Sequence, residues 1–297
     1  MKVTATKKRE WLIAYTLILP AFLVYLIFRI YPVFYGFFLS LQDWDGFSAM
    51  RFIGFGNYRE AFNDKIFLLS LGHNVIYAIF TVIGKNILGF ILALFLTRKT
   101  IKLMPLWRTI FFIPVVVSTV AFGIIWSWLL NASFGLVNEM LRAIGLSVLA
   151  RSWLSDPKVV LLTLIMVDIA KWTGYHTVIY IAGLQSLPSE LFEAAYIDGA
   201  RSFQVVRFIT LPLLLPIIGI NILTSLIGGF SVFDLVFILT GGGPLHASEV
   251  IMTRMYSVAF QFHRVGYGTA MTFIMFIVVF ILSVIQLRLT QRRSYEF

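Results

Sequence analysis

Long apolar segments separated by shorter polar ones dominate the pattern of this 297-residue chain. A helix of about 20 residues crosses a bilayer core about 30 Å thick, because it rises about 1.5 Å per residue. Backbone groups inside lipid must be hydrogen-bonded within the protein, so each segment is expected to be helical. The pattern predicts an all-α, polytopic membrane protein with six transmembrane helices, at about residues 11–41, 71–97, 109–130, 159–186, 208–232 and 266–287.

Composition excludes an ordinary soluble domain. Charged residues make up 13% of the chain and hydrophobic residues 59%, whereas soluble domains carry about 25% charged residues. The absence of cysteine excludes disulfides and thiolate chemistry. The first apolar run is longer than the roughly 7–15 apolar residues of a signal peptide, so we expect it to be a retained span. The spacing of the four histidines does not match that of metal ligands, so no metal site is expected. They are His73, His176, His246 and His263.

The positions of the basic residues predict the orientation in the membrane. If the N-terminus is cytoplasmic, 13 Lys and Arg residues fall in the 52 residues of the inner segments and 8 in the 90 residues of the outer loops. Such a bias towards the cytoplasmic side is typical of bacterial inner-membrane proteins. The net charge of +10 is therefore attributed to the orientation of the chain in the membrane and not to nucleic-acid binding. We expect both termini in the cytoplasm, with an N-terminal segment at 1–10, one membrane domain at 11–287 and a C-terminal tail at 288–297.

Two predicted spans carry polar residues at helical spacing. Offsets of 0, +3, +4 and +7 place four residues on one face of a helix. In both spans they lie at a similar depth, roughly 16–30 Å from the cytoplasmic end by the helical rise. Transporters tend to bind solutes near the middle of the membrane, so the two stripes predict a cavity there. The stripes consist of Asp168, Lys171, Trp172 and Tyr175 in the fourth span, and of Asn221, Thr224, Ser225 and Gly228 in the fifth.

The residue types in these stripes suit a sugar. Aromatic faces pack against a pyranose ring, and carboxylate, amide and hydroxyl groups bond sugar hydroxyls. A structural interpretation stays open, because Asp168 and Lys171 can form an ion pair, and small polar residues are common where membrane helices pack. Lys85 in the second span can balance Asp168 or bind an anionic solute, and Arg29 is expected to extend towards the outer headgroups. The candidate substrate-binding residues are Asp168, Lys171, Trp172, Tyr175, Asn221 and Ser225.

A compact polar patch at 187–212 interrupts the apolar sequence. Ser189 can cap a short helix there, since Ser accepts hydrogen bonds from the first free N–H groups. Ala194 and Ala195 allow the close approach of a partner, and Gly199 allows the chain to turn. From these residues alone, a solvated loop and a socket for a partner protein remain open alternatives.

The patch resembles a known motif. Residues 193–216 read EAAxxDGAxxxxxxxxITLPLLxP, which is similar to the EAA loop of the membrane subunits of bacterial ATP-binding-cassette importers. The form LPSELFEAAYIDGA resembles the carbohydrate-importer permeases of the maltose and glycerol-phosphate types. Tyr31-Pro32 with Ser40, GLQSLP at 183–188, LTGGGP at 239–244 and the Tyr256, Phe260, Gly266-Tyr267 run extend the resemblance over nearly the whole chain.

The resemblance implies a role and a set of partners. In that family the EAA loop forms the coupling helices, which dock on a cytoplasmic ATPase. Partners implied are a second similar permease, two ATPase subunits that use ATP and Mg, an extracytoplasmic solute-binding protein and membrane lipid. The chain lacks the Walker pattern GxxxxGK[ST], so the ATPase must be another chain, and no cofactor is expected on this one. The residues implied in coupling are Glu193, Ala194, Ala195, Asp198 and Gly199.

The sequence thus predicts a permease subunit that conducts a sugar or oligosaccharide across the bacterial inner membrane by alternating access. One alternative is an importer of a phosphorylated polyol, for which Lys85 and Lys171 would bind the anion. Another is a membrane-embedded enzyme that uses Asp168, Lys171 and His176, although the chain contains neither a GxSxG nor an HExxH motif.

Overall fold

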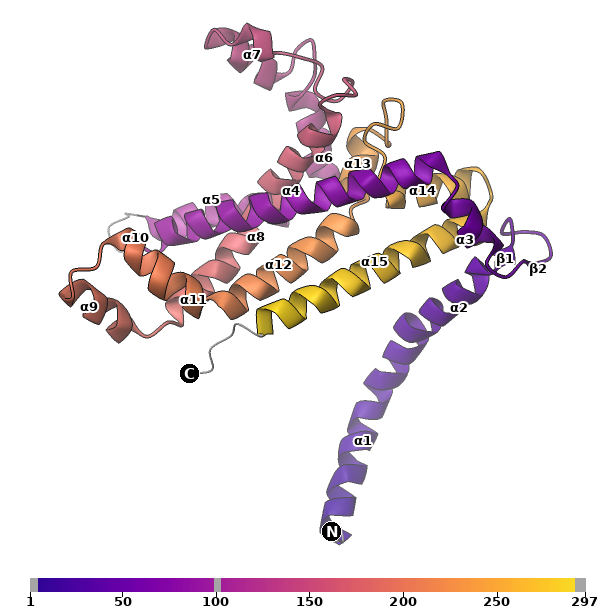
Figure 1. The fold of residues 1–297 in the computed structure, drawn as a ribbon, viewed down its shortest axis with the longest axis horizontal. Coiled ribbons are helices and arrows are strands. Elements are labelled where there is room, and N and C mark those ends of the chain that lie inside the picture. The colour runs from indigo at the N-terminus through magenta and orange to yellow at the C-terminus, as the bar shows by residue number, and fades with distance from the viewer. Residues whose placement is uncertain (1–4, 99–102, 292–297) are drawn as a thin grey trace. The chain divides into compact units, whose positions relative to one another are not determined.

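Helices make up nearly all of the fold (Figure 1). The computed structural model describes residues 5–98 and 103–291; parts of both predicted tails, with Lys99 and Lys102, lie outside the described residues. Within the described ranges, the strands are the two-residue β1 (Gln42–Asp43) and β2 (Arg51–Phe52). The all-α class is therefore confirmed. Contacts divide the chain into a first unit, residues 1–63 with 255–274, and a second unit, residues 64–254 with 275–297.

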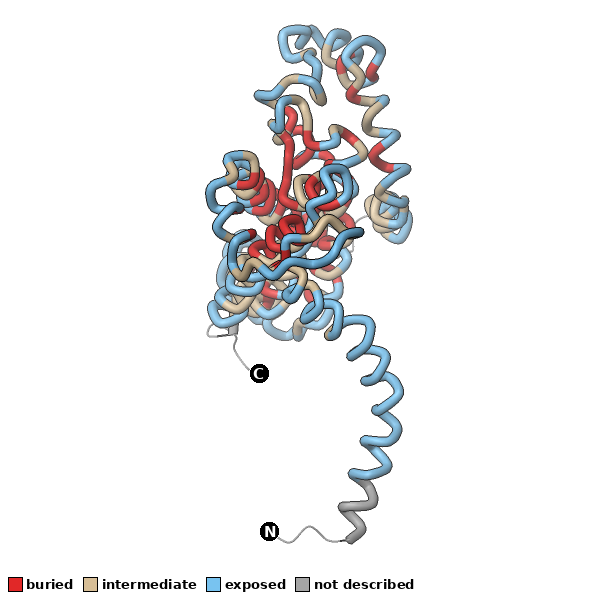
Figure 2. The backbone as a smooth tube through the Cα atoms, turned by 90° about the vertical axis from the view of Figure 1, so that its right-hand side faces the viewer, coloured by how far each residue is buried: buried red, intermediate tan, exposed pale blue. Residues whose placement is uncertain are grey.

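The first unit starts with one long apolar helix. Residues Trp11–Ser40 form a 30-residue helix that is long and apolar enough to cross a membrane, and its side chains are almost all exposed (Figure 2). Pro32 has no N–H group, and the turn before it is π-helical: the N–H of Tyr31 bonds the carbonyl of Leu26. This helix consists of α1 (Ala5–Tyr25), the π turn Leu26–Ile30 and α2 (Tyr31–Ser40).

A small hairpin and a short helix follow α2 and are tied to it by buried polar groups. The side-chain amide of Asn57 in α3 (Gly56–Ala61) donates to the carbonyls of Ser40 at 2.9 Å and Gln42 at 2.8 Å. Arg264 holds both carboxylate oxygens of Glu60 at 2.6 and 2.7 Å. These contacts give the loop after the first span a defined structure.

The second unit is built around three packed helices, α4 (Lys65–Leu96), α8 (Val160–Gln185) and α12 (Leu215–Phe230). The helix α4 begins at Lys65, six residues before the predicted position, because the Asp64 carboxylate accepts from the N–H groups of Ile66 and Phe67. Buried positions recur along these three helices, whereas residues 11–40 of α1, the π turn and α2 have almost none (Figure 2). Fully buried members of this core include Tyr77, Leu96, Leu164, Tyr180 and Leu214.

Two of the six predicted spans are sharply bent. The third is α5 (Met104–Val116) followed by α6 (Thr119–Leu129), with their axes at 98°; the fifth, Ser202–Leu213 followed by Leu215–Phe230, bends by 72°. Three described helices are long and apolar enough to span by themselves, and the bent pairs raise the number to five. The 26-residue α8 is also long enough, but its polar side chains lower its hydropathy. The count of six stays a prediction.

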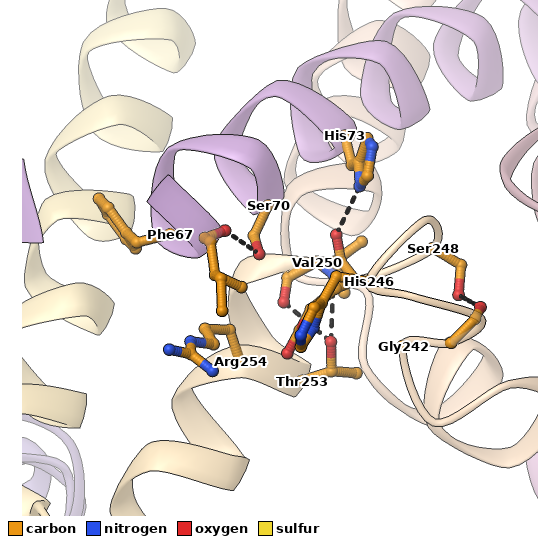
Figure 3. A network of polar contacts seen from close by, with 12 residues as sticks. Phe67, Ser70, His73, Gly242, His246, Ser248, Val250, Thr253 and Arg254 are labelled. Atoms are coloured by element: carbon orange, nitrogen blue, oxygen red, sulfur yellow. Dashed lines mark hydrogen bonds and ion pairs between the residues drawn. The ribbon is translucent and has the colours of Figure 1, made fainter. Parts of the chain in front are cut away.

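The loop that contains LTGGGP is braced against the start of α4 (Figure 3). Nδ1 of His73 lies 3.0 Å from the carbonyl of Glu249, and Oδ1 of Asn74 accepts from the N–H of Ile251 at 2.7 Å. Arg254 pairs with Asp64 at 3.3 Å, and Glu249 is also paired with His246. Because α4 supplies both His73 and Asn74, this loop is fixed to the same helix that carries Lys85.

Shorter helices connect these parts. In chain order they are α7 (Leu136–Ala143), the 3-10 turn Ser147–Leu149, α9 (Ser189–Ile197), α10 (Ser202–Val205), the π turn Val206–Thr210, α11 (Leu211–Leu213), α13 (Asp234–Leu239), α14 (Ile251–Tyr256) and the π turn Ser257–Gln261. The last described helix is α15 (Val265–Gln291).

Gly174 allows α8 to pack directly on the backbone of α5. A Cβ atom on Gly174 would lie 2.0 Å from the carbonyl oxygen of Phe111, where no side-chain movement can relieve the clash. We expect Gly174→Ala to lower the free energy of unfolding by about 1–3 kcal/mol or more, as overpacking does. Thermal unfolding of the purified protein in detergent measures this. Gly72→Ala in α4 is the matched control, since nothing lies within 4 Å of its Cβ position; equal effects of the two changes would contradict the predicted close packing.

Candidate functional site

A cavity of about 320 Å³ with several polar side chains in its wall lies in the second unit, where α4, α6, α8 and α12 approach one another. Three of the residues predicted on α8 contribute to its wall, together with Ser225 of α12. The chain that follows α12 closes another part of the wall. The residues that line the cavity are Lys85, Thr119, Asp168, Trp172, Tyr175, His176, Thr224, Ser225, Gly228, Ser231, Val232, Phe233, Asp234 and Leu235.

Asp168 and Lys85 form a buried ion pair at the cavity wall. Nζ of Lys85 lies 2.5 Å from Oδ2 of Asp168, and both side chains are less than a tenth exposed. The pair joins α4 to α8, the two helices with the most extensive contact in the fold. Of the two roles predicted for Lys85, the structure therefore shows the balancing of Asp168. A buried charge without such a partner costs several kcal/mol, so each residue of the pair depends on the other.

Lys171 does not face the cavity with its predicted neighbours. Its Nζ donates to the carbonyls of Pro114 at 3.1 Å and Val117 at 2.6 Å, at the break between α5 and α6. An offset of three residues turns a side chain by 300°, which leaves it 60° from Asp168 around the helix, and the long lysine stem extends that difference towards α5. Of the pairs that the sequence left open for Asp168, the structure shows the one with Lys85 and not the one with Lys171.

A chain of hydrogen bonds crosses from α8 to α12 beside the cavity. Nδ1 of His176 lies 2.8 Å from Oδ1 of Asn221, and Nε2 lies 3.1 Å from the Ser225 hydroxyl. An amide oxygen only accepts, so His176 donates through Nδ1. Asn86 of α4 donates to the same Ser225 hydroxyl at 3.1 Å and accepts from Tyr180 at 2.7 Å. The two predicted polar stripes therefore meet, although Asn221 is buried behind the cavity wall and is not among its lining residues.

The aromatic side of the cavity is made by Trp172 and Tyr175. Their rings meet edge to face, with centroids 6.3 Å apart and planes at 89°, and both side chains are partly exposed. Both residues line the cavity, and the edge-to-face contact is a favourable arrangement of two aromatic rings. Sequence reasoning named His176 only for the enzyme alternative, not as a substrate contact, and it missed Asn86. Their spacing was a usable signal, because His176 lies one turn after Trp172 and Asn86 adjoins Lys85.

The segment 187–212, here called the EAA segment, contains the largely exposed helix α9, which ends in a tight turn. The N–H groups of Gly199 and Ala200 bond the carbonyls of Tyr196 and Ala195, and Gly199 has a φ of +79°. These are the paired bonds of a Schellman motif, which requires a residue that accepts positive φ. Ser189 does not cap α9: it is the first helical residue, and Pro188 occupies the cap position without a side-chain bond. Glu193, Ala194, Asp198 and Gly199 are exposed and Ala195 is half-buried, so the residues predicted to couple are accessible.

Comparison with known proteins identifies the family. The family model described as "Binding-protein-dependent transport system inner membrane component" matches residues 85–295. The chain belongs to this family. Among its relatives, a probable ABC transporter permease protein, YurN of Bacillus subtilis, is 39% identical over 93% of this chain and 95% of its own. The multiple sugar-binding transport system permease protein MsmF of Streptococcus mutans is 31% identical over 98% and 99%.

Other relatives extend the comparison. The trehalose/maltose transport system permease protein MalF of Thermococcus litoralis is 33% identical over 97% of this chain and 96% of its own. A chain from the crystal structure of a bacterial ABC transporter involved in the import of the acidic polysaccharide alginate is 25% identical, with a TM-score of 0.83 and 96% of each chain covered. The chain is therefore a transport permease and an inner-membrane component with several apolar helices.

The ion pair generates a prediction about stability. We expect Lys85→Met or Asp168→Asn alone to destabilise the protein by about 3–5 kcal/mol, because each leaves one buried charge without its partner. The double variant Lys85→Met with Asp168→Asn leaves neither charge and should be more stable than either single variant. Thermal unfolding of all four proteins forms a double-mutant cycle. Additive losses would show that the two side chains do not interact.

Proposed function

We propose that this permease forms the pathway of a sugar or oligosaccharide in an ATP-driven importer, and that its cavity contacts the solute. The observation that carries the proposal is the lining of the cavity, in which Trp172 and Tyr175 stand beside the hydroxyl groups of Thr224 and Ser225. Sugars are bound by this combination, because ring faces pack on aromatic side chains while hydroxyls need donors and acceptors. The volume of about 320 Å³ is at the lower end of the roughly 300–1,000 Å³ of small-molecule sites.

The predicted contacts divide into two kinds under this proposal. Asp168, Trp172, Tyr175 and Ser225 line the cavity and are proposed to touch the solute. Asn221 orients His176 from behind the wall, and Lys171 acts at the break between α5 and α6. The names of two relatives, which describe multiple-sugar and trehalose/maltose transport systems, support a carbohydrate for this chain as well.

The charge of the cavity favours an uncharged solute. Lys85 is the cation among its lining residues, and Asp168 neutralises it, while Asp234 adds a second carboxylate. The ammonium group of Lys171 donates to backbone carbonyls, so it is not available to bind an anion in the cavity. A phosphorylated polyol would need unpaired cations or N–H donors, and this cavity provides a carboxylate instead. The arrangement also gives little support to an enzyme, since Lys171 donates to the carbonyls of Pro114 and Val117 and not to Asp168 or His176.

Coupling to ATP is proposed to occur at the EAA segment on the cytoplasmic side. Both termini would then be cytoplasmic, as the distribution of basic residues predicts. Exposed apolar side chains surround the predicted coupling residues: Ile197 is 86% exposed and Phe203 71%. Exposed apolar clusters of this kind mark protein interfaces. The partners proposed are two ATPase subunits that use ATP and Mg, a second permease and an extracytoplasmic binding protein.

The proposed solute contact is tested by removing one aromatic face. With the complete importer in proteoliposomes, we expect Trp172→Ala to raise the solute concentration for half-maximal uptake about tenfold, the equivalent of a lost contact of about 1.4 kcal/mol. Trp128→Ala is the control, because Trp128 is 68% exposed and is not among the residues that line the cavity. If Trp172→Ala leaves half-saturation unchanged for every sugar transported, the cavity is not the solute site.

The proposed selectivity is tested by comparing a neutral sugar with its phosphorylated form in the same importer. Uptake and solute-stimulated ATPase activity should respond to the neutral sugar and at least tenfold less to the phosphorylated one, because the anion would face Asp168 and Asp234. Preference for the phosphorylated solute would favour the polyol-phosphate alternative.

The coupling role is tested at two glycines that have the same backbone conformation. Gly199 has a φ of +79° and Gly145, after α7, a φ of +80°; each closes its helix with the same pair of turn bonds, and neither has an atom within 4 Å of its Cβ position. A change to Val therefore adds similar strain, of order 1–3 kcal/mol, at both. We expect Gly199→Val to abolish uptake while the protein still inserts, and Gly145→Val to preserve uptake. Equal uptake by the two variants would contradict a special role for the EAA segment.

A further inference from the structure

Lys171 occupies an unusual place for a charged side chain in an apolar helix. It is only 2% exposed, and in the described part of the chain it takes part in no ion pair. The nearby Asp168 is held by Lys85 instead. The ammonium group of Lys171 therefore depends on other groups for its stabilisation, and these come from α5 and from two aromatic rings.

The break between α5 and α6 provides carbonyl acceptors. The last carbonyls of any helix lack N–H partners, and the end of α5 carries the negative end of the helix dipole. The N–H of Val117 still bonds the carbonyl of Ile113, but the chain then turns by 98° into α6. The carbonyls of Pro114 and Val117 receive Nζ of Lys171 instead, at 3.1 and 2.6 Å. A cation suits this position on both counts, hydrogen bonding and charge.

Two aromatic rings enclose the same ammonium group. Nζ of Lys171 lies 5.0 Å from the ring centroid of Phe122 in α6 and 5.3 Å from that of Trp172 in α8. Both distances are within the range of a cation–π contact. The carboxyl end of α5, the first turn of α6 and one wall of the cavity are thus all in contact with a single ammonium group.

The position of α6 affects the cavity directly. Thr119, the first residue of α6, lines the cavity and follows Val117 by two residues, and Trp172 lines it from α8. We propose that Lys171 is a positioning residue of the transport pathway: its ammonium cation stabilises the end of α5 and sets the direction of α6 and the orientation of Trp172. This inference rests on the proposed role of the cavity in transport.

The inference differs from a direct contact with solute in what each predicts. A solute contact at Lys171 affects only the binding of solute. A positioning role changes the surroundings of Thr119 even when no solute is present. It also depends on the positive charge and its donors, so Lys171→Arg should restore what Lys171→Met loses.

Because the chain has no cysteine, Thr119→Cys is a single reporter in this chain within the assembled importer. We would measure the rate at which a maleimide labels Cys at this position in solute-free proteoliposomes, together with solute uptake. We expect Lys171→Met to change the labelling rate at least fivefold and to lower maximal uptake at least tenfold. Lys171→Arg should recover most of both values relative to the Thr119→Cys parent.

Lys158→Met is the matched control, since Lys158 is an exposed lysine in the loop before α8. If Lys171→Met raises half-saturation but leaves the labelling rate unchanged, Lys171 is a solute contact and the positioning role is wrong. The inference is also wrong if Lys171→Met does not differ from Lys158→Met. If Lys171→Met does not assemble, Lys171→Gln and Lys171→Arg take its place: recovery by Arg and not by Gln supports the cation, and equal values for both contradict it.

The same reporter separates this inference from the proposed function. If solute does not protect Cys at position 119 from labelling, but Lys171→Met still changes the labelling rate, then Lys171 positions α6 and the cavity is not where solute binds. If solute protects and Lys171→Met has no effect on the rate, the proposed cavity stands and the role of Lys171 is contradicted.

Discussion

Charged groups inside this apolar protein must find their partners within the protein itself, and the charges of α8 do so on two neighbouring helices. Asp168 is paired with Lys85 of α4, and Lys171 donates to two carbonyls at the end of α5. Backbone and side-chain groups in a bilayer have no water to replace a lost partner. The two contacts therefore hold α4, α5 and α8 in one arrangement, and α4 and α8 line the cavity.

The close approach of these helices requires small residues at the right positions. Gly174 lies against the carbonyl of Phe111, and Gly89 lies against His176, where an added Cβ would meet the His176 Cβ at 3.0 Å. Membrane helices associate through such packing and through buried hydrogen bonds, because apolar burial drives association much less in lipid than in water. Packing and polar contacts act together here: without the glycines, the helices would stand too far apart for the ion pair at 2.5 Å.

The fold was predictable from the sequence where it depends on local pattern, and less so where it depends on partners. The apolar runs located the long helices, and the shared offsets located the two polar stripes that meet through His176, Asn221 and Ser225. The partner of Lys171 was not predictable, because it is a backbone carbonyl on another helix and depends on how that helix ends. The break after Val117 had only Pro114 as a signal. Likewise Ser189 suits a helix cap by type, but α9 already begins at that residue.

The contacts that hold α12 at the cavity differ in kind from the ion pair that joins α4 to α8. The helix α12 is joined to α8 by the bonds of His176 to Asn221 and Ser225, and to α4 by Asn86. These are hydrogen bonds between uncharged groups, each worth about 0.5–1.5 kcal/mol net, whereas breaking a buried ion pair costs about 3–5 kcal/mol. On the side of the EAA segment, α12 begins at a bend of 72° whose central residue, Leu214, is fully buried. The helix α12 is thus directly continuous with the EAA segment, and its polar contacts to α8 and α4 are weaker than the ion pair that joins those two helices. A displacement of that segment would break the fewest strong interactions if it were taken up by α12.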